Sequence, residues 1–444
     1  MTLTTTTAAQ QDQHGNPIRG DRAAVALYDE AIDAFLPFKP AVVDLATTLS
    51  TERPEVAMGH ALVAYLHLMS SEHRDVEVAV AAHQAMSTCE LGEREQAHRR
   101  AIGEWIRGRW HAAADALDDL LLRWPTDLLA LQIGHQLDFF LGDAQNLRDR
   151  VGRSLSAIAG HPHHGFVLGM QAFGLEESGH HEAAEDAGMA ALDAHPDDVW
   201  AIHAVAHAHE MRGKVAEGVD LYESRVPDWG SGNLFTVHNW WHLALFKLEQ
   251  GDLEGVLDIY DAEVHHQGSD GVALEMLDAS ALLWRLHLDG TDVGDRWAPL
   301  ADAWTAADGA PWYAFNDLHA AMAYVGAGRL GDARRVVDRL ASYVAEDEGG
   351  SNLMMTAEVG LPATRAVVAF AEGRWDDAVA ELAPRRRWFN RFGGSHAQRD
   401  VLQRTLLEAA VRGGQHDLAR TLVSERLAVR PTSAYARAQS TRLP

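Results

Sequence analysis

Apolar and polar positions follow a helical rhythm along most of the chain. Within each block, apolar residues recur three or four positions apart, and short polar turns that contain glycine separate the blocks. That spacing places the apolar side chains on one face of an α-helix. Runs with the two-residue alternation of a half-buried strand are nearly missing from the sequence. The pattern predicts an all-α protein built from pairs of helices.

Nine of these turn glycines recur at intervals of 34 to 45 residues. They are Gly108, Gly142, Gly179, Gly213, Gly251, Gly290, Gly328, Gly373 and Gly414. A period of this size indicates a helical repeat array, because one helix pair cannot bury its apolar face alone and copies must stack. Glycine suits the turn between paired helices because it enters the left-handed region without steric cost. We therefore expect an α-solenoid of stacked helix-turn-helix units.

Small residues and prolines stand at fixed offsets from the glycines, as in tetratricopeptide repeats. Alanine lies five positions after five of them, and proline ends the second helix at Pro125, Pro196 and Pro431. The helix before each glycine, called helix A here, is expected to line the concave surface. The eight A helices are expected near 126–141, 162–178, 197–212, 234–250, 272–289, 313–327, 357–372 and 396–412.

The expected organisation has three parts. Residues 1–20 are expected to be a disordered lead, residues 21–90 a helical cap that does not keep the period, and residues 91–436 the repeat array with no clear internal boundary. The chain has no basic and apolar leader at its N-terminus, and no apolar stretch approaches the roughly 20 residues of a membrane helix. We therefore expect a cytoplasmic protein with no membrane partner, either a monomer or a homodimer.

Composition narrows the classes of function. The formal net charge is −26, which disfavours a nucleic-acid partner because like charges repel the phosphate backbone. Cys89 is the single cysteine, so a disulfide framework and a Cys-x-x-Cys zinc site are excluded. Arginine greatly outnumbers lysine, which favours a bacterial source.

Histidines concentrate on the A helices in the middle of the chain. His203, His207 and Glu210 follow the i, i+4, i+7 spacing of one helix face. The next A helix repeats the i, i+4 spacing with His238 and His242, and Asn239 lies beside them.

The distance of each polar residue from its repeat glycine predicts which side chains meet. His242 and His319 lie nine residues before their glycines, and His203 lies ten before. Asp278 and Asn316 lie twelve before, and His238 thirteen before. These are similar depths on adjacent helices, so we expect one continuous polar band across the groove.

Three interpretations of this band compete. The side chains can satisfy buried helix ends, as buried polar atoms must. They can bind a metal, because paired histidines on two helices have the spacing for zinc or another nitrogen-preferring ion. They can also do acid–base chemistry without a metal, because histidine titrates near neutral pH.

A second segment, residues 393–400, carries a capping-box pattern in Ser395 and Gln398. Arg399 goes beyond what a cap needs and is expected to bind an anionic group in the groove.

Several segments together resemble the tetratricopeptide repeat protein 38 family. They are PTDLLALQIGHQLDFFLGD (125–143), HPDDVWAIHAVAHAHEM (195–211), VHNWWHLALF (237–246), VGDRW (293–297), FNDLHAAMA (315–323), VGLP (359–362) and GGSHAQRD (393–400). The resemblance covers nearly the whole chain and implies a tetratricopeptide-like α-solenoid. It brings no established reaction, substrate or catalytic residue.

The sequence favours an enzyme that acts on a small molecule by acid–base chemistry, without a cofactor. The expected catalytic residues are His207, His242, Asp278 and Glu210, and the expected ligand-binding residues are His203, His238, Asn239, Trp241, Asn316, His319 and Arg399. The alternative is a scaffold that binds a peptide or protein. A metalloenzyme is the second alternative, with His203, His207, His238 and His242 as its ligands.

Overall fold

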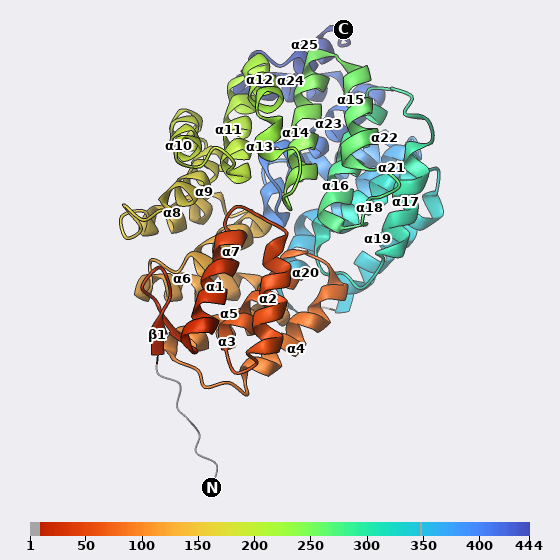
Figure 1. The fold of residues 1–444 in the computed structure, drawn as a ribbon. Coiled ribbons are helices and arrows are strands. Elements are labelled where there is room, and N and C mark those ends of the chain that lie inside the picture. Colours follow the sequence, from red (N-terminus) through yellow and green to blue (C-terminus); the bar gives the residue numbers. More distant parts are fainter. Residues whose placement is uncertain (1–8, 347–348) are drawn as a thin grey trace.

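The computed structural model describes residues 9–346 and 349–444, and the described chain is almost entirely helical (Figure 1). The N-terminal part contains β1 (Ala9–Gln11), β2 (Pro17–Arg19), α1 (Arg22–Phe35), α2 (Ala41–Glu52), α3 (Ala57–Met69) and α4 (Val76–Met86). The helix pairs of the array then follow: α5 (Glu93–Ile106) with α6 (Trp110–Arg123), α7 (Leu128–Leu141) with α8 (Ala144–Ser154), α9 (His164–Glu177) with α10 (His181–Ala194), α11 (Val199–Arg212) with α12 (Val215–Ser224), and α14 (Thr236–Gln250) with α15 (Leu253–Ile259).

The array continues to the C-terminus in the same manner. Its pairs are α16 (Ala273–Leu288) with α17 (Trp297–Ala306), α18 (Ala314–Gly326) with α19 (Leu330–Glu346), α21 (Leu361–Ala371) with α22 (Trp375–Leu382), and α23 (His396–Arg412) with α24 (His416–Val429). The short helices α13 (Val226–Trp229), α20 (Ser351–Met355) and α25 (Ala434–Thr441) stand outside this pairing. The all-α solenoid predicted from the glycine period is confirmed.

The repeat glycines have the left-handed backbone conformation that was expected for these turns. All nine have positive φ angles, between 68° and 86°. Gly142 and Gly213 cap α7 and α11 in the left-handed region. At Gly142, an added Cβ would lie 1.7 Å from the carbonyl oxygen of Asn390. At Gly213, it would lie 1.9 Å from Oγ1 of Thr432. These two glycines therefore also let distant parts of the chain approach closely.

The solenoid winds back on itself, so that late repeats pack against early ones. The backbone N–H of Ser351 donates to the carbonyl of Gly108 at 2.8 Å, and Nδ2 of Asn390 donates to the carbonyl of Gly142 at 3.2 Å. Near the C-terminus, Arg430 is paired with Glu210. In Figure 1 the last helices, in blue, lie behind α11 and α14.

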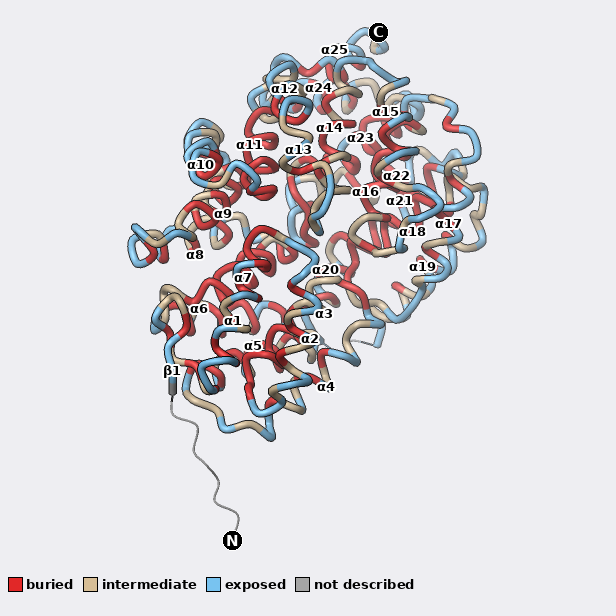
Figure 2. Tube along the Cα trace, in the orientation of Figure 1, coloured by how far each residue is buried: buried red, intermediate tan, exposed pale blue. Residues whose placement is uncertain are grey.

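This winding places late repeats against the concave side of the A helices. Figure 2 shows that the A helices α7, α11 and α16 run mostly through buried positions. Trp284 of α16 donates its Nε1–H to Oγ1 of Thr405 on α23 at 2.9 Å, and Arg285 donates to the carbonyl of Ala397 at 2.6 Å. The A helices, which were expected to line the concave surface, are therefore covered by later repeats at these points.

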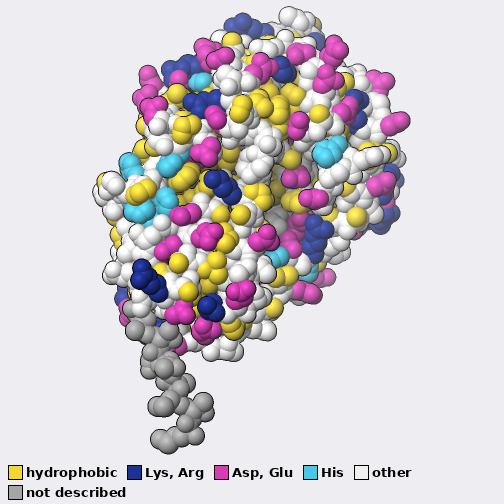
Figure 3. Space-filling view, viewed as in Figure 1, with side chains coloured by type: hydrophobic (Ala, Val, Ile, Leu, Met, Phe, Trp, Pro, Cys, Tyr) yellow, Lys and Arg dark blue, Asp and Glu magenta, His cyan; other side chains and the backbone are white. Residues whose placement is uncertain are grey.

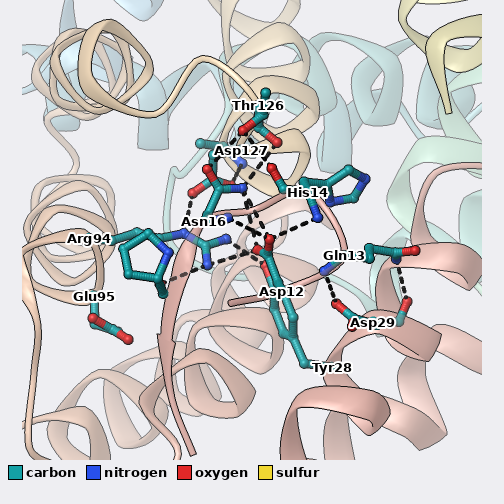
Figure 4. Close-up of polar contacts among 12 residues, drawn as sticks. Asp12, Gln13, His14, Asn16, Tyr28, Asp29, Arg94, Glu95, Thr126 and Asp127 are labelled. Carbon is teal, nitrogen blue, oxygen red and sulfur yellow. Dashed lines mark hydrogen bonds and ion pairs between the residues drawn. The ribbon is translucent and has the colours of Figure 1, made fainter. Parts of the chain in front are cut away.

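The N-terminal residues form a hairpin where disorder was expected. Strands β1 and β2 pair antiparallel, and Figure 4 shows the hairpin tied to the helices beneath it. The buried guanidinium of Arg94 lies 3.0 Å from Asp12 and 2.7 Å from Asp127, and Asn16 donates to the carbonyl of Thr126 at 3.2 Å. The expected disorder does not hold for residues 9–19, and residues 1–8 lie outside the described part.

One helical stretch passes the length and composition test for a membrane span, contrary to the sequence expectation. Ser351–Ala371 covers 21 residues with a mean hydropathy of 1.3. However, 72% of this window is buried inside the molecule. A core helix of an α-solenoid has the same composition, since it packs on both sides.

Candidate metal centre

Four histidines from two adjacent A helices converge in the middle of the molecule. His203 and His207 lie one turn apart on α11, and His238 and His242 lie one turn apart on α14. The two helices pack against each other (Figure 1). One ring nitrogen from each histidine lies within 4.8 Å of the corresponding nitrogen of the other three. The sequence prediction that these four side chains share one face is confirmed.

A carboxylate from a third helix orients one of the rings. Nδ1 of His238 lies 2.7 Å from Oδ2 of Asp278, which is on α16 and 1% exposed. A carboxylate only accepts hydrogen bonds, so this contact places a proton on Nδ1 of His238. Nε2 is then the nitrogen that His238 presents to the other histidines.

The contacts of that nitrogen do not form a complete hydrogen-bond network. Nε2 of His238 lies 3.2 Å from Nε2 of His203 and 3.2 Å from Nε2 of His242. One imidazole nitrogen has a single in-plane lone pair or a single hydrogen, so it can satisfy one of these neighbours and not both. Three Nε2 atoms that face one another in this way have the arrangement of ligands around a cation.

Burial keeps two of the rings neutral. His203 and His242 are 2% and 1% exposed. Burial, together with the other histidines of the cluster, holds the pKa of both rings well below the ordinary value for histidine. A neutral ring has a free lone pair, which is the form that binds a metal.

Aromatic side chains surround the four rings. Phe173, Trp200, Phe235 and Trp241 each contact at least one of the histidines, with ring centroids 4.8 to 5.3 Å apart. The side chain of His238 is the most exposed of the four, at 15%. The surroundings therefore exclude most water, which strengthens every electrostatic contact inside.

His207 differs from its neighbours because acidic residues lie behind it. Its Nδ1 lies 3.4 Å from Oε2 of Glu176, on α9. Burial acts to lower the pKa of His207, but Glu176, with Glu177 and Glu210 further away, outweighs it and raises the pKa above its ordinary value. The Nε2 atom of His207 is buried and lacks a hydrogen-bond partner among the described residues.

Asn239, Asn316 and His319 have other partners, so the continuous polar band predicted from repeat depth is wrong. Asn239 accepts from the hydroxyl of Tyr222 at 3.0 Å, and Asn316 donates to the carbonyl of Ser71 at 3.0 Å. Nδ1 of His319 lies 2.7 Å from the carbonyl of Phe315, within its own helix.

Of the remaining candidate residues, Glu210 and Arg399 form ion pairs, and Trp241 packs against the histidine cluster. Glu210 pairs with Arg430, so it does not orient His207 through a direct contact. Arg399 lies 3.1 Å from Glu177 and is 8% exposed, so its charge is already paired. Trp241 stacks on His238 with an interplanar angle of 19°, as a wall of the cluster.

Glu176 and Glu177 were missed because the sequence analysis compared positions by their depth alone. Glu176 lies three residues before Gly179, whereas His207 lies six before Gly213. A long side chain on a helix points toward the helix N-terminus, so Glu176 reaches back by about one turn to the level of His207. A correction for side-chain direction would have found this carboxylate.

A second histidine group shows what a satisfied cluster looks like. His side chains gather on the face shown in Figure 3 around α8 and α9, where His14, His161 and His163 lie in mutual ring contact. Nε2 of His14 meets Nδ1 of His163 at 2.9 Å, and Nε2 of His163 lies 3.2 Å from Asp33. Each of these contacts can pair one donor with one acceptor, unlike the contacts of His238.

The chain was compared with known protein families and solved structures. No family model matches the chain. A structure of a monomeric mutant of IFIT1 with Gppp-AAAA has a TM-score of 0.41 and 13% identity, and the match covers 95% of each chain. A human IFIT1 dimer with m7Gppp-AAAA has a TM-score of 0.42 and 13% identity, and the match covers 99% of this chain and 96% of that one. The helix order and the turn glycines of this chain show a tetratricopeptide-like all-helical solenoid.

One inference from the sequence is also corrected. The exclusion of nucleic acid as a partner is withdrawn; the two IFIT1 structures contain Gppp-AAAA and m7Gppp-AAAA. The exclusion rested on the net charge of the whole chain. Net charge does not describe the charge at any one site, so it gives no ground for the exclusion.

Proposed function

We propose that this protein is a helical-repeat scaffold that holds a first-row divalent transition metal with four histidines. His203, His207, His238 and His242 are the proposed ligands, and Asp278 orients His238. The observation that carries the proposal is that Nε2 of His238 lies 3.2 Å from Nε2 of His203 and 3.2 Å from Nε2 of His242, although it can pair with only one of them. A bound cation turns this unfavourable contact into a set of ligand bonds.

The distances fit zinc. Zinc–imidazole bonds are about 2.0–2.1 Å long, so the edge of a tetrahedral nitrogen site is about 3.3–3.4 Å. The two measured Nε2–Nε2 distances of 3.2 Å lie close to that edge. Imidazole also suits copper, iron and nickel, and four nitrogen ligands without oxygen make magnesium and calcium poor candidates.

The contact between Asp278 and His238 supports a bound metal rather than a metal-free pair of histidines that transfer a proton. Histidines that bind metals commonly donate their other N–H to a carboxylate, which fixes the tautomer and the ring orientation. The metal-free acid–base site formed by His207 and His242 is the competing proposal. It gives no account of why Nε2 of His238 meets two other Nε2 atoms.

The surroundings favour a scaffold over an enzyme. Three of the four rings are nearly buried, and structural zinc sites are closed whereas catalytic sites keep an open position. The narrower assignment to the tetratricopeptide repeat protein 38 family rests on the sequence motifs alone and is part of this proposal. We also propose that the protein is cytoplasmic and acts as a monomer or a homodimer.

The proposal is tested by zinc content. The parent protein, His242→Gln and His319→Gln are stripped with chelator, loaded with zinc, dialysed and measured by elemental analysis. His319 is a matched control, because it is 0% exposed and lies outside the four-histidine cluster.

The expected result is that His242→Gln holds one zinc fewer per chain than the parent, while His319→Gln holds the same amount as the parent. Equal zinc in the parent and in folded His242→Gln contradicts the proposal.

A further inference from the structure

Glu176 is a buried carboxylate that the four-histidine site does not explain. It lies on α9 and is 0% exposed. Within residues 9–346 and 349–444, neither of its oxygens has a hydrogen-bond partner. An isolated ionised carboxylate in a protein interior is costly unless it is paired or binds a metal. The side chain therefore lacks its counterpart.

The groups around Glu176 are metal ligands. Oε2 lies 3.4 Å from Nδ1 of His207, and Oε1 lies 3.7 Å from Nδ1 of His181. Glu177 is adjacent, and one ligand atom each from Glu176, Glu177 and His207 lies within 4.8 Å of the other two. A charge-assisted hydrogen bond between nitrogen and oxygen is about 2.7–2.9 Å long, so the 3.4 Å contact is too long to satisfy the carboxylate.

Glu177 has partners of its own, unlike Glu176. It accepts from the backbone N–H of His396 at 2.7 Å and from Arg399 at 3.1 Å. These contacts fix its position, and carboxylate oxygens keep further lone pairs for a cation. Glu176 and Glu177 are therefore not equivalent: Glu177 accepts hydrogen bonds, whereas Glu176 has only two long contacts with histidine nitrogens among the described residues.

We propose that Glu176, Glu177 and His207 form a second cation site that shares His207 with the four-histidine site. His207 directs Nδ1 toward Glu176, which leaves Nε2 for the four-histidine site. The second site offers oxygen together with nitrogen, so it takes a divalent ion such as zinc or manganese. His181 is an additional ligand on its open side, where its side chain is 24% exposed. This inference rests on the proposed function only through the shared His207.

The mixed ligand set separates the two sites chemically. The four-histidine site supplies nitrogen alone, whereas the second site supplies carboxylate oxygen and imidazole nitrogen. Two ions bound through Nδ1 and Nε2 of His207 make a two-metal centre, in which the ring releases its N–H proton to solvent and bridges as an imidazolate. The acidic side lies on α9 and the imidazole side on α11 and α14.

The test counts zinc ions per chain in four proteins: the parent, Glu176→Gln, His242→Gln and Glu408→Gln. Each is stripped, loaded with excess zinc and dialysed before elemental analysis. Glu408→Gln is the matched control, because Glu408 is 2% exposed and its carboxylate is paired with Arg412 and Arg442. We expect two zinc ions in the parent and in Glu408→Gln, and one in each of the other two variants.

The outcomes separate this inference from the proposed function. One ion in the parent that Glu176→Gln keeps and His242→Gln loses overturns the second site and leaves the four-histidine site standing. One ion in the parent that Glu176→Gln loses and His242→Gln keeps supports the second site and overturns the four-histidine site. No ion in the parent overturns both.

A stability measurement keeps the test decisive if a variant folds poorly. Glutamine has the shape of glutamate without the charge, so Glu176→Gln removes a buried carboxylate whose contacts with His207 and His181 are long. We expect a higher thermal midpoint for metal-free Glu176→Gln than for the metal-free parent, and a smaller rise of that midpoint when zinc is added. A lower metal-free midpoint for Glu176→Gln overturns the inference, because Glu176 is then already stabilised without an ion.

Discussion

Replacement of Asp278 by asparagine tests how the protein prepares the four-histidine site. Oδ2 of Asp278 accepts the Nδ1–H of His238 at 2.7 Å, and Asp278 is 1% exposed. Asparagine keeps the size of the side chain but removes its charge. It can also present its amide N–H to His238, which moves the ring proton to Nε2 and blocks the lone pair that would bind the metal.

The expected loss follows from the position of Asp278 behind a ligand. Removal of a carboxylate that orients a metal-binding histidine lowers affinity about 10–100-fold, or about 1.4–2.7 kcal/mol. The short distance and the near-complete burial of Asp278 place the expected loss toward the upper end. Zinc affinity is measured by competition with a chromophoric chelator at fixed pH and salt.

Asp317→Asn is the matched control for this measurement. Asp317 is also a buried carboxylate on an A helix, at 8% exposed, but it accepts from Arg339 at 2.9 Å and lies outside the four-histidine cluster. We expect the affinity of Asp317→Asn to equal that of the parent. A zinc affinity of Asp278→Asn within twofold of the parent, in a folded variant, refutes the reasoning.

Three further predictions concern stability. Burial lowers the pKa of His135 to about 3 and that of His319 to about 4, so both rings stay neutral in the fold while the unfolded chain takes up protons below about pH 6.5. The free energy of unfolding should therefore fall by up to about 1.4 kcal/mol per pH unit for each histidine below that pH. A urea-unfolding free energy that does not change from about pH 6.5 to about pH 5 contradicts this. Gly142→Ala should destabilise the fold by more than about 3 kcal/mol, because the new Cβ meets the Asn390 carbonyl oxygen at 1.7 Å. Gly179→Ala is the control, since Gly179 has φ +86° and open space around it, and it should cost about 1–2 kcal/mol. Equal losses of unfolding free energy in denaturant count against the close approach at Gly142. Arg94→Met leaves Asp12 and Asp127 without their buried arginine and should lower the free energy of unfolding by about 3–5 kcal/mol. Arg100→Met is the control, because its side chain is 63% exposed, and it should cost under about 1 kcal/mol. Similar unfolding midpoints for the two variants contradict the role of Arg94.

Local signals in the sequence were sufficient for the helices and the turns. The A helix expected at 396–412 is His396–Arg412, and the one expected at 197–212 is Val199–Arg212. Both depend on apolar periodicity and on glycine in the left-handed region, which are properties of neighbouring residues. For the same reason, the shared face of His203 and His207 followed directly from the i, i+4 spacing.

Contacts between distant repeats could not be derived in this way. The small rotation from one repeat to the next decides whether an open groove remains or late repeats fill it, and that rotation depends on side-chain packing along the whole array. Asn316, for example, has the repeat depth of Asp278 but donates to Ser71 in the N-terminal part. Depth within a repeat therefore predicts neighbours on adjacent helices only where the winding is regular.

The most direct test of the central claim is the coordination shell of the first zinc ion bound. The metal-free protein is given one equivalent of zinc, and its X-ray absorption is recorded at the zinc edge. The account predicts four nitrogen ligands at about 2.0–2.1 Å with the outer scattering of imidazole rings. A shell made mainly of oxygen, or one without imidazole scattering, would contradict the claim that these four histidines hold the ion.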